Sequence, residues 1–79
     1  MYLVYAIRSE VDGRIYVGIS ANVQRRLKQH NAGYVFSTKG FRPWKLIYSE
    51  ETFNRKRARV REKYLKSGVG KELLKSIPR

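Results

Sequence analysis

The 79-residue sequence contains no cysteine, only six acidic residues and only two prolines. Without cysteine, the chain has neither a disulfide framework nor a thiolate metal site, which fits a reducing compartment. No apolar run approaches the roughly 18–20 residues of a transmembrane helix, and the first residues do not resemble a signal peptide. We therefore expect a cytoplasmic protein with no membrane partner.

Positive charge is the dominant property of the composition. Eighteen lysines and arginines against six acids give a formal net charge of +12, and ten of the cations lie between Arg55 and Arg79. Cations that neutralise phosphates release condensed counterions, so this charge favours a nucleic-acid partner. An anionic membrane surface or a basic ribosome-associated protein is the alternative, but neither requires the residue spacing described below.

The pattern of apolar residues predicts one small α+β domain over residues 1–79. Tyr2–Ile7 is apolar on both faces and is predicted to be a central strand, which a turn at Asp12-Gly13 connects to a strand over Arg14–Ile19. A third strand is predicted over Trp44–Ser49. Helices are expected from residues 20–22 to Ala32, from residues 52–54 to Gly68, and over Lys71–Ser76. The order β-β-α-β-α-α predicts a small three-stranded, mostly antiparallel sheet flanked by helices.

Several side chains that could take part in catalysis lie on these strands and on the first helix. Tyr5 and Tyr16 are eleven residues apart on the two paired strands, and Gly18 follows the second tyrosine. On the first helix, His30 shares a face with the apolar residues and Arg26 lies one turn earlier. The two strands, this helix and Glu62 are expected to form one site.

Glu62 is an acid within the apolar face of an otherwise basic helix. It shares this face with Ala58 and Leu65 at the spacing i, i+4, i+7. A single inward carboxylate whose remaining partners are water and phosphate suits one Mg²⁺ ion, or Mn²⁺ in its place. The structural alternative is a surface ion pair between Glu62 and Lys66, four residues later.

In this order and spacing, the residues resemble the GIY-YIG nuclease family, in particular its small stand-alone bacterial members. The strand Arg-Pro-x-x-Leu-Ile-Tyr (residues 42–48) and the helix Arg-Glu-Lys-x-Leu-Lys (residues 61–66) resemble those members most. The resemblance covers nearly the whole chain. It implies a phosphodiester-cleaving site with Glu62 as the metal ligand and with these catalytic residues: Tyr5, Tyr16, Arg26, His30 and Glu62.

The sequence departs from the family pattern at three places. Leu3 replaces the first glycine, a common change among small members. Ile19 stands where some branches have a lysine, and no asparagine follows the glutamate helix as it does in the excision-repair branch. A sequence-specific role or an excision-repair role is therefore not supported.

The chemistry of hydrolysis suggests a role for each side chain. The guanidinium of Arg26 can hold the scissile phosphate. A tyrosine can take a proton from water only if cations lower its pKa of about 10. We expect Tyr5 to activate or orient the water with Tyr16 as its partner, although the sequence does not order the two. His30 is expected to carry a proton, and Gly18 to let the substrate backbone come close.

Further residues are predicted to bind the nucleic acid. The phosphate contacts are Lys39, Arg25, Arg55 and Arg59, and the basic run from Arg55 to Lys63 is a candidate phosphate track. The loop aromatics at positions 34, 36 and 41 either stack on a strand or anchor their loop. Taken singly, each candidate residue could have a purely structural role. The tyrosines could pack in the core, Arg26 could be a solvated surface cation, and His30 could be a hydrogen-bonded core histidine.

These observations predict a metal-dependent DNA endonuclease directed to DNA structure or to single strands, with a role in repair or recombination. Single-stranded or branched DNA is expected as substrate rather than plain duplex, because nothing beyond this domain adds base specificity. A monomer or weak homodimer is expected. The alternatives are a non-catalytic nucleic-acid-binding module and an RNA-directed nuclease.

Overall fold

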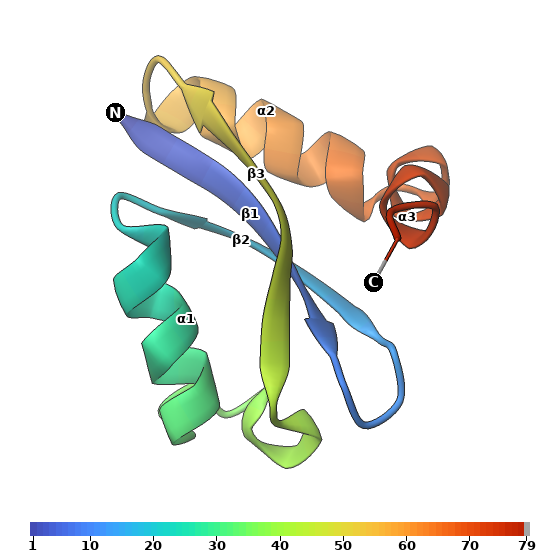
Figure 1. Cartoon of the computed structure of the whole chain (residues 1–79). Helices are drawn as coiled ribbons and strands as arrows, with labels where there is room; N and C mark the ends of the chain where they lie inside the picture. Colours follow the sequence, from blue (N-terminus) through green and yellow to red (C-terminus); the bar gives the residue numbers. More distant parts are fainter. Residues whose placement is uncertain (79) are drawn as a thin grey trace.

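The computed structural model describes residues 1–78 and has three layers, with a sheet between helices (Figure 1). Its strands are β1 (Tyr2–Ser9), β2 (Ile15–Ser20) and β3 (Trp44–Thr52). All neighbours pair antiparallel in the order β2-β1-β3. The predicted α+β fold, the hairpin and the central position of the first strand are confirmed.

Helices cover both faces of the sheet. Helix α1 (Val23–Ala32) lies on one face, while α2 (Arg55–Lys66) and α3 (Gly68–Lys75) lie on the other (Figure 1). A short 3-10 helix, η1 (Lys39–Phe41), precedes β3. Within residues 1–78, no helix is both long and apolar enough to cross a bilayer.

The alternation of side chains along β1 builds a core on each side of the sheet. Tyr5 and Ile7 pack under α1 together with Val23 and Trp44. The other face of β1 and β2 packs against α2 and α3, through Val4, Ala6, Val17, Ala58, Leu65 and Leu74. Both faces of β1 are therefore buried, as expected of a central strand.

Caps determine where the helices begin and end, and three predicted boundaries shift. The side chain of Asn22 accepts from the backbone N–H of Arg25 and starts α1, and Gly33 ends it with a φ of 88°. Asn54 caps α2 in the same way, and β3 runs on to Thr52, beyond the predicted Ser49, because it stays paired with β1 up to Tyr2. Ser67 ends α2 at Lys66, before the predicted Gly68, and also caps α3, which therefore begins at Gly68 and not at Lys71.

Candidate active site

The two tyrosines and Gly18 lie at the join of β1 and β2. Tyr5 is the direct cross-strand partner of Gly18, and the rings of Tyr5 and Tyr16 are 6.4 Å apart. A Cβ on Gly18 would lie 2.6 Å from the hydroxyl oxygen of Tyr5. The ring of Tyr5 therefore fills the space that glycine leaves, which gives Gly18 a packing role besides the predicted role in substrate approach.

His30 joins this group from α1. Its Nε2 lies 2.9 Å from the hydroxyl of Tyr5, and its Nδ1 lies 2.8 Å from the hydroxyl of Thr38. The ring of Tyr16 meets that of His30 edge to face, with centroids 4.9 Å apart. The structure thus brings both predicted tyrosines and the predicted histidine together.

Burial changes the acid–base character of these groups. Burial raises the pKa of Tyr5 to about 12, against a smaller lowering influence from Arg26. Burial also lowers the pKa of His30 to about 4, with a further contribution from the charge of Arg26. The expectation that nearby cations lower the pKa of the water-activating tyrosine is wrong for Tyr5, because desolvation outweighs them. Both groups are neutral at pH 7.

Accessibility separates the two tyrosines. Tyr5 is 1% exposed, so solvent does not reach its hydroxyl freely, whereas Tyr16 is only partly buried. Tyr5 is therefore an interior residue of the cluster, and Tyr16 is the tyrosine that solvent can reach. This arrangement disagrees with the expectation that Tyr5 handles the attacking water directly.

Arg26 and Arg25 lie at the open side of α1. Nη1 of Arg26 donates to Oε1 of Gln29 at 3.0 Å, which orients a half-buried guanidinium. Both arginines line a shallow groove of about 250 Å³ that also includes Ser20 and Asn22. A phosphate in this groove would meet both guanidinium groups.

Glu62 approaches from the opposite layer. Its helix packs on the far face of β1 and β2, yet its charge raises the pKa of Tyr5 as a minor contribution behind burial. The Glu62 side chain is 21% exposed, and its carboxylate forms an ion pair of 3.2 Å with Lys66. The surface pair considered from the sequence is therefore present, and a cation that binds Glu62 has to compete with Lys66.

The donor set fits a single hard divalent cation. Within the described chain, no three His, Cys, Asp or Glu side chains gather into a metal cluster. One partly exposed carboxylate is what Mg²⁺ requires when substrate phosphate and water complete its shell. Glu62 is thus the residue that could hold such an ion.

The cations of α2 divide between two sides of the helix. Arg55 and Arg59 are seven and three residues before Glu62, so they share its side and are exposed. Arg61 instead binds Glu50 through two hydrogen bonds of 2.9 and 3.0 Å. Arg61 is therefore engaged within the protein, whereas Arg55 and Arg59, on the same side of α2 as Glu62, remain available for phosphate contacts.

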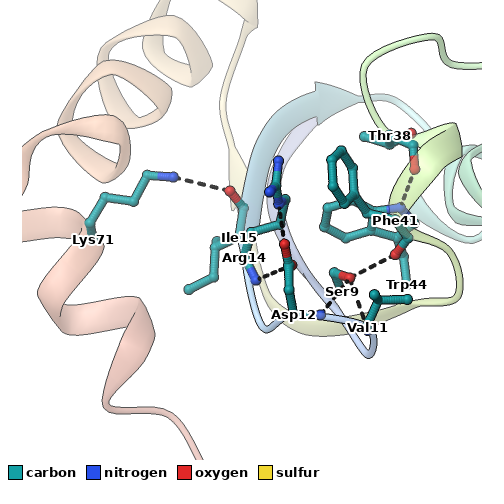
Figure 2. Close-up of polar contacts among 9 residues, drawn as sticks. All are labelled: Ser9, Val11, Asp12, Arg14, Ile15, Thr38, Phe41, Trp44 and Lys71. Carbon is teal, nitrogen blue, oxygen red and sulfur yellow. Dashed lines mark hydrogen bonds and ion pairs between the residues drawn. The ribbon is translucent and has the colours of Figure 1, made fainter.

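The loop between α1 and β3 contains both anchors and exposed aromatics. Phe41 packs in the core beneath the Arg14 guanidinium, 3.5 Å from its ring centroid, and its carbonyl accepts from Ser9 (Figure 2). Tyr34 and Phe36 are 81% and 85% exposed. Lys39 lies 5.3 Å from the ring centroid of Phe36. Phe41 is therefore the anchor, and the other two aromatics are free to contact a ligand.

Thr38 and Gln29 are site residues that the sequence reasoning missed. Thr38 is 1% exposed and contacts His30, and Gln29 contacts Arg26. Thr38 belongs to an irregular loop, where no periodicity assigns a side chain to a face. Gln29 follows Arg26 by three residues on a helix, and this spacing was a usable signal.

Comparisons of sequence and of structure with known proteins agree on one group of small relatives. A sequence model of the GIY-YIG catalytic domain matches residues 1–75. A UPF0213 protein of Clostridium perfringens is 35% identical over 78 residues, which are 98% of this chain and 83% of that protein. The solution NMR structure of the UPF0213 protein BH0048 from Bacillus halodurans has 31% identity and a TM-score of 0.56, and the match covers 94% of this chain and 82% of that one.

A second group of relatives is much longer than this chain. The human structure-specific endonuclease subunit SLX1 is 37% identical over 51 residues, which are 60% of this chain but 18% of that protein. The corresponding mouse protein is 39% identical over 51 residues. The chain therefore spans about a fifth of the length of these relatives.

Proposed function

Because the chain belongs to the GIY-YIG family, we propose that it is a metal-dependent DNA endonuclease. The observation that carries the proposal is the cluster of Tyr5, Tyr16 and His30 beside Gly18, with Arg26 one turn before His30 on α1, all within the matched region. Hydrolysis adds the oxygen of water to phosphorus and breaks the bond from phosphorus to one ester oxygen. The products are a phosphate monoester and an alcohol.

Arg26 binds the scissile phosphate in this proposal. Its guanidinium is half-buried and oriented by Gln29, so little side-chain freedom is lost when a phosphate binds. Arg25 lines the same groove and adds a second cation. Together they neutralise charge that grows on the phosphate oxygens in the transition state.

Tyr16 orients the attacking water, and Tyr5 has a structural role as a buried hydrogen-bond partner of His30. We assign the water to Tyr16 because its ring is partly exposed, whereas Tyr5 is 1% exposed and bonded to His30. A raised pKa keeps Tyr5 protonated at pH 7, so it acts as a hydrogen-bonding group and not as a phenolate. His30 holds both rings in position.

Glu62 holds the divalent cation, with Mg²⁺ or Mn²⁺ as the candidates. When bound, such an ion supplies a Lewis acid that polarises the phosphate and stabilises the leaving oxygen. The flanking residues Arg55 and Arg59 attract the DNA backbone towards this side of α2. Lys66 occupies the carboxylate while no ion is bound.

The substrate is single-stranded or branched DNA, and the role is in repair or recombination. The relatives called structure-specific endonuclease subunit support this substrate class. The loop supports it as well, since Tyr34 and Phe36 expose aromatic faces on which unpaired bases can stack. Lys39 lies beside them and contributes a phosphate contact. The reaction is expected in the cytoplasm.

Glu62→Gln is the variant that tests the proposal. It removes the charge that holds the ion but keeps the size of the side chain, so cleavage should fall by at least about 100-fold while DNA binding stays within about twofold. The assay compares single-stranded, branched and duplex DNA and RNA, each with Mg²⁺ and with EDTA. Glu72→Gln is the matched control, because Glu72 is an exposed acid on α3.

The outcomes separate the three candidate functions. Cleavage of branched or single-stranded DNA that requires Mg²⁺ and Glu62 supports the proposal. Binding without cleavage of any substrate identifies a non-catalytic binding module. Cleavage of RNA alone identifies an RNA-directed nuclease, and cleavage by Glu62→Gln at the normal rate contradicts the role of Glu62.

A further inference from the structure

A buried chain of hydrogen bonds runs from Tyr5 through His30 to Thr38. The hydroxyl of Tyr5 is 2.9 Å from Nε2 of His30, and Nδ1 of His30 is 2.8 Å from the hydroxyl of Thr38. Tyr5, His30 and Thr38 are 1%, 0% and 1% exposed, so water does not compete with these hydrogen bonds. Because hydroxyls and a neutral imidazole both donate and accept, such a chain can run in either of two directions.

The carbonyl of Val35 favours one direction. The hydroxyl of Thr38 lies 3.3 Å from this carbonyl oxygen and donates its proton there. The oxygen of Thr38 is then the acceptor for an N–H at Nδ1 of His30. Nε2 of His30 consequently carries a lone pair and accepts the proton of Tyr5.

The charge of Arg26 favours the same direction. Burial is the main influence on both pKa values: it raises that of Tyr5, which Arg26 partly offsets, and it lowers that of His30, which Arg26 lowers further. Arg26 lies one turn before His30 on α1, and its charge acts on both groups. A cation attracts the lone pairs of a phenol oxygen and repels its O–H dipole, so the proton of Tyr5 points away from Arg26 and towards His30.

We propose that Thr38 is a positioning residue that holds His30 in its Nδ1–H tautomer. In this state His30 holds the phenol proton of Tyr5, and the lone pairs of the Tyr5 oxygen remain available to accept from a cationic donor such as Arg26. In the opposite tautomer, Nε2–H would donate to Tyr5 and turn the phenol proton towards Arg26. The role of the tautomer in phosphate binding rests on the proposed function, whereas the assignment of the tautomer does not.

The surrounding loop keeps Thr38 in place. Its backbone N–H donates to the carbonyl of Val35 at 3.1 Å. Its own carbonyl accepts from Nε1 of Trp44 at 2.8 Å, as Figure 2 shows. Trp44 is buried in the core under α1. The hydroxyl of Thr38 is thus presented to His30 by a backbone that is fixed at both of its polar groups.

Nitrogen NMR of the whole chain tests the tautomer directly, because the sequence contains a single histidine. In the wild-type protein without substrate, we expect Nδ1 to be protonated and Nε2 unprotonated at neutral pH. A wild-type spectrum with a protonated Nε2, or with an average of the two tautomers, overturns the proposal. This measurement does not require cleavage, so it is independent of the proposed function.

Variants of Thr38 test its role in holding the tautomer. Thr38→Val removes the hydroxyl, and we expect protonation at Nε2 to appear and kcat to fall by about tenfold with KM near the wild-type value. Thr38→Ser keeps the hydroxyl and should restore both. Thr52→Val is the control, because it removes another buried threonine hydroxyl, which donates to the carbonyl of Tyr2 at 2.7 Å.

The possible outcomes distinguish positioning from simple packing. A Thr38→Val protein that folds and keeps the wild-type tautomer overturns the proposal, even if cleavage is lost. If Thr38→Val does not fold, the spectra of the wild type and Thr38→Ser decide, since both must show the Nδ1–H form. Absence of cleavage in every variant counts against the proposed function and leaves the tautomer result standing.

Discussion

Replacing Gly18 with alanine tests how closely Tyr5 fits against β2. An alanine Cβ would lie 2.6 Å from the hydroxyl oxygen of Tyr5 and 2.8 Å from its Cζ. Both contacts are too short for a Cβ, so the ring has to shift, which disrupts its hydrogen bond with Nε2 of His30. Overpacking costs about 1–3 kcal/mol, and the lost buried hydrogen bond costs about 1–3 kcal/mol more. We expect Gly18→Ala to lower the free energy of unfolding by about 2–6 kcal/mol.

Urea denaturation followed by the fluorescence of Trp44, the only tryptophan, measures this change. Gly40→Ala is the matched control, because a Cβ there has no neighbour within 4 Å. Adding Tyr5→Phe to Gly18→Ala removes the atom closest to the new Cβ, so the double variant should be more stable than additivity predicts by about 1 kcal/mol. Equal stability of Gly18→Ala and Gly40→Ala would refute the close packing.

Three further predictions concern pH, metal and substrate. The lowered pKa of His30, about 4, means that the unfolded chain binds a proton before the folded chain does. Stability should therefore be complete above pH ~6.5 and about 2 kcal/mol lower at pH ~5, as measured by urea denaturation. Lys66→Met should tighten Mg²⁺ binding at Glu62 by about 2- to 5-fold in an NMR titration, since exposed ion pairs contribute about 0.3–1 kcal/mol. Joint replacement of Tyr34 and Phe36 by alanine should weaken binding to a single-stranded oligonucleotide by about tenfold or more, and to duplex by less than about twofold, in fluorescence anisotropy.

Each of these predictions has a control that changes only one factor. His30→Gln should remove the part of the acid sensitivity that belongs to His30, and an identical pH profile would contradict the assignment. Lys75→Met removes the same charge from α3 and should leave Mg²⁺ affinity unchanged. Phe53→Ala removes an aromatic that is as exposed as Phe36, at 85%, and equal losses from both changes would indicate non-specific binding.

The sequence was sufficient for the architecture because its local signals agree with one another. Apolar residues on both faces of Tyr2–Ile7 predicted the central strand, and the structure buries that strand under α1 on one side and under α2 and α3 on the other. The helix stop at Gly33 has the positive φ that glycine allows. Boundaries were less predictable where a single residue serves two elements, as Ser67 does between α2 and α3.

For the candidate site, the proximity of three side chains was predictable from the sequence, but their acid–base properties were not. Spacing along strands and helices brought Tyr5, Tyr16 and His30 together, as the structure confirms. Spacing says nothing about desolvation, and desolvation raises the pKa of Tyr5 where the surrounding cations suggested a lower value. Nor does it fix the side chains of an irregular loop, so the contact between Thr38 and His30 could only come from the structure.

The residues of the site differ in how far chemistry and folding can be separated by mutation. Tyr5, His30 and Thr38 are each at most 1% exposed, so their replacement changes the core as well as the site. Arg26 and Glu62 keep part of their surface exposed and hold few internal contacts, so replacing them changes charge more than packing. Loss of cleavage on changing a buried member therefore needs a stability measurement beside it. Loss on changing Arg26 or Glu62, with unfolding unaltered, points to the chemistry itself.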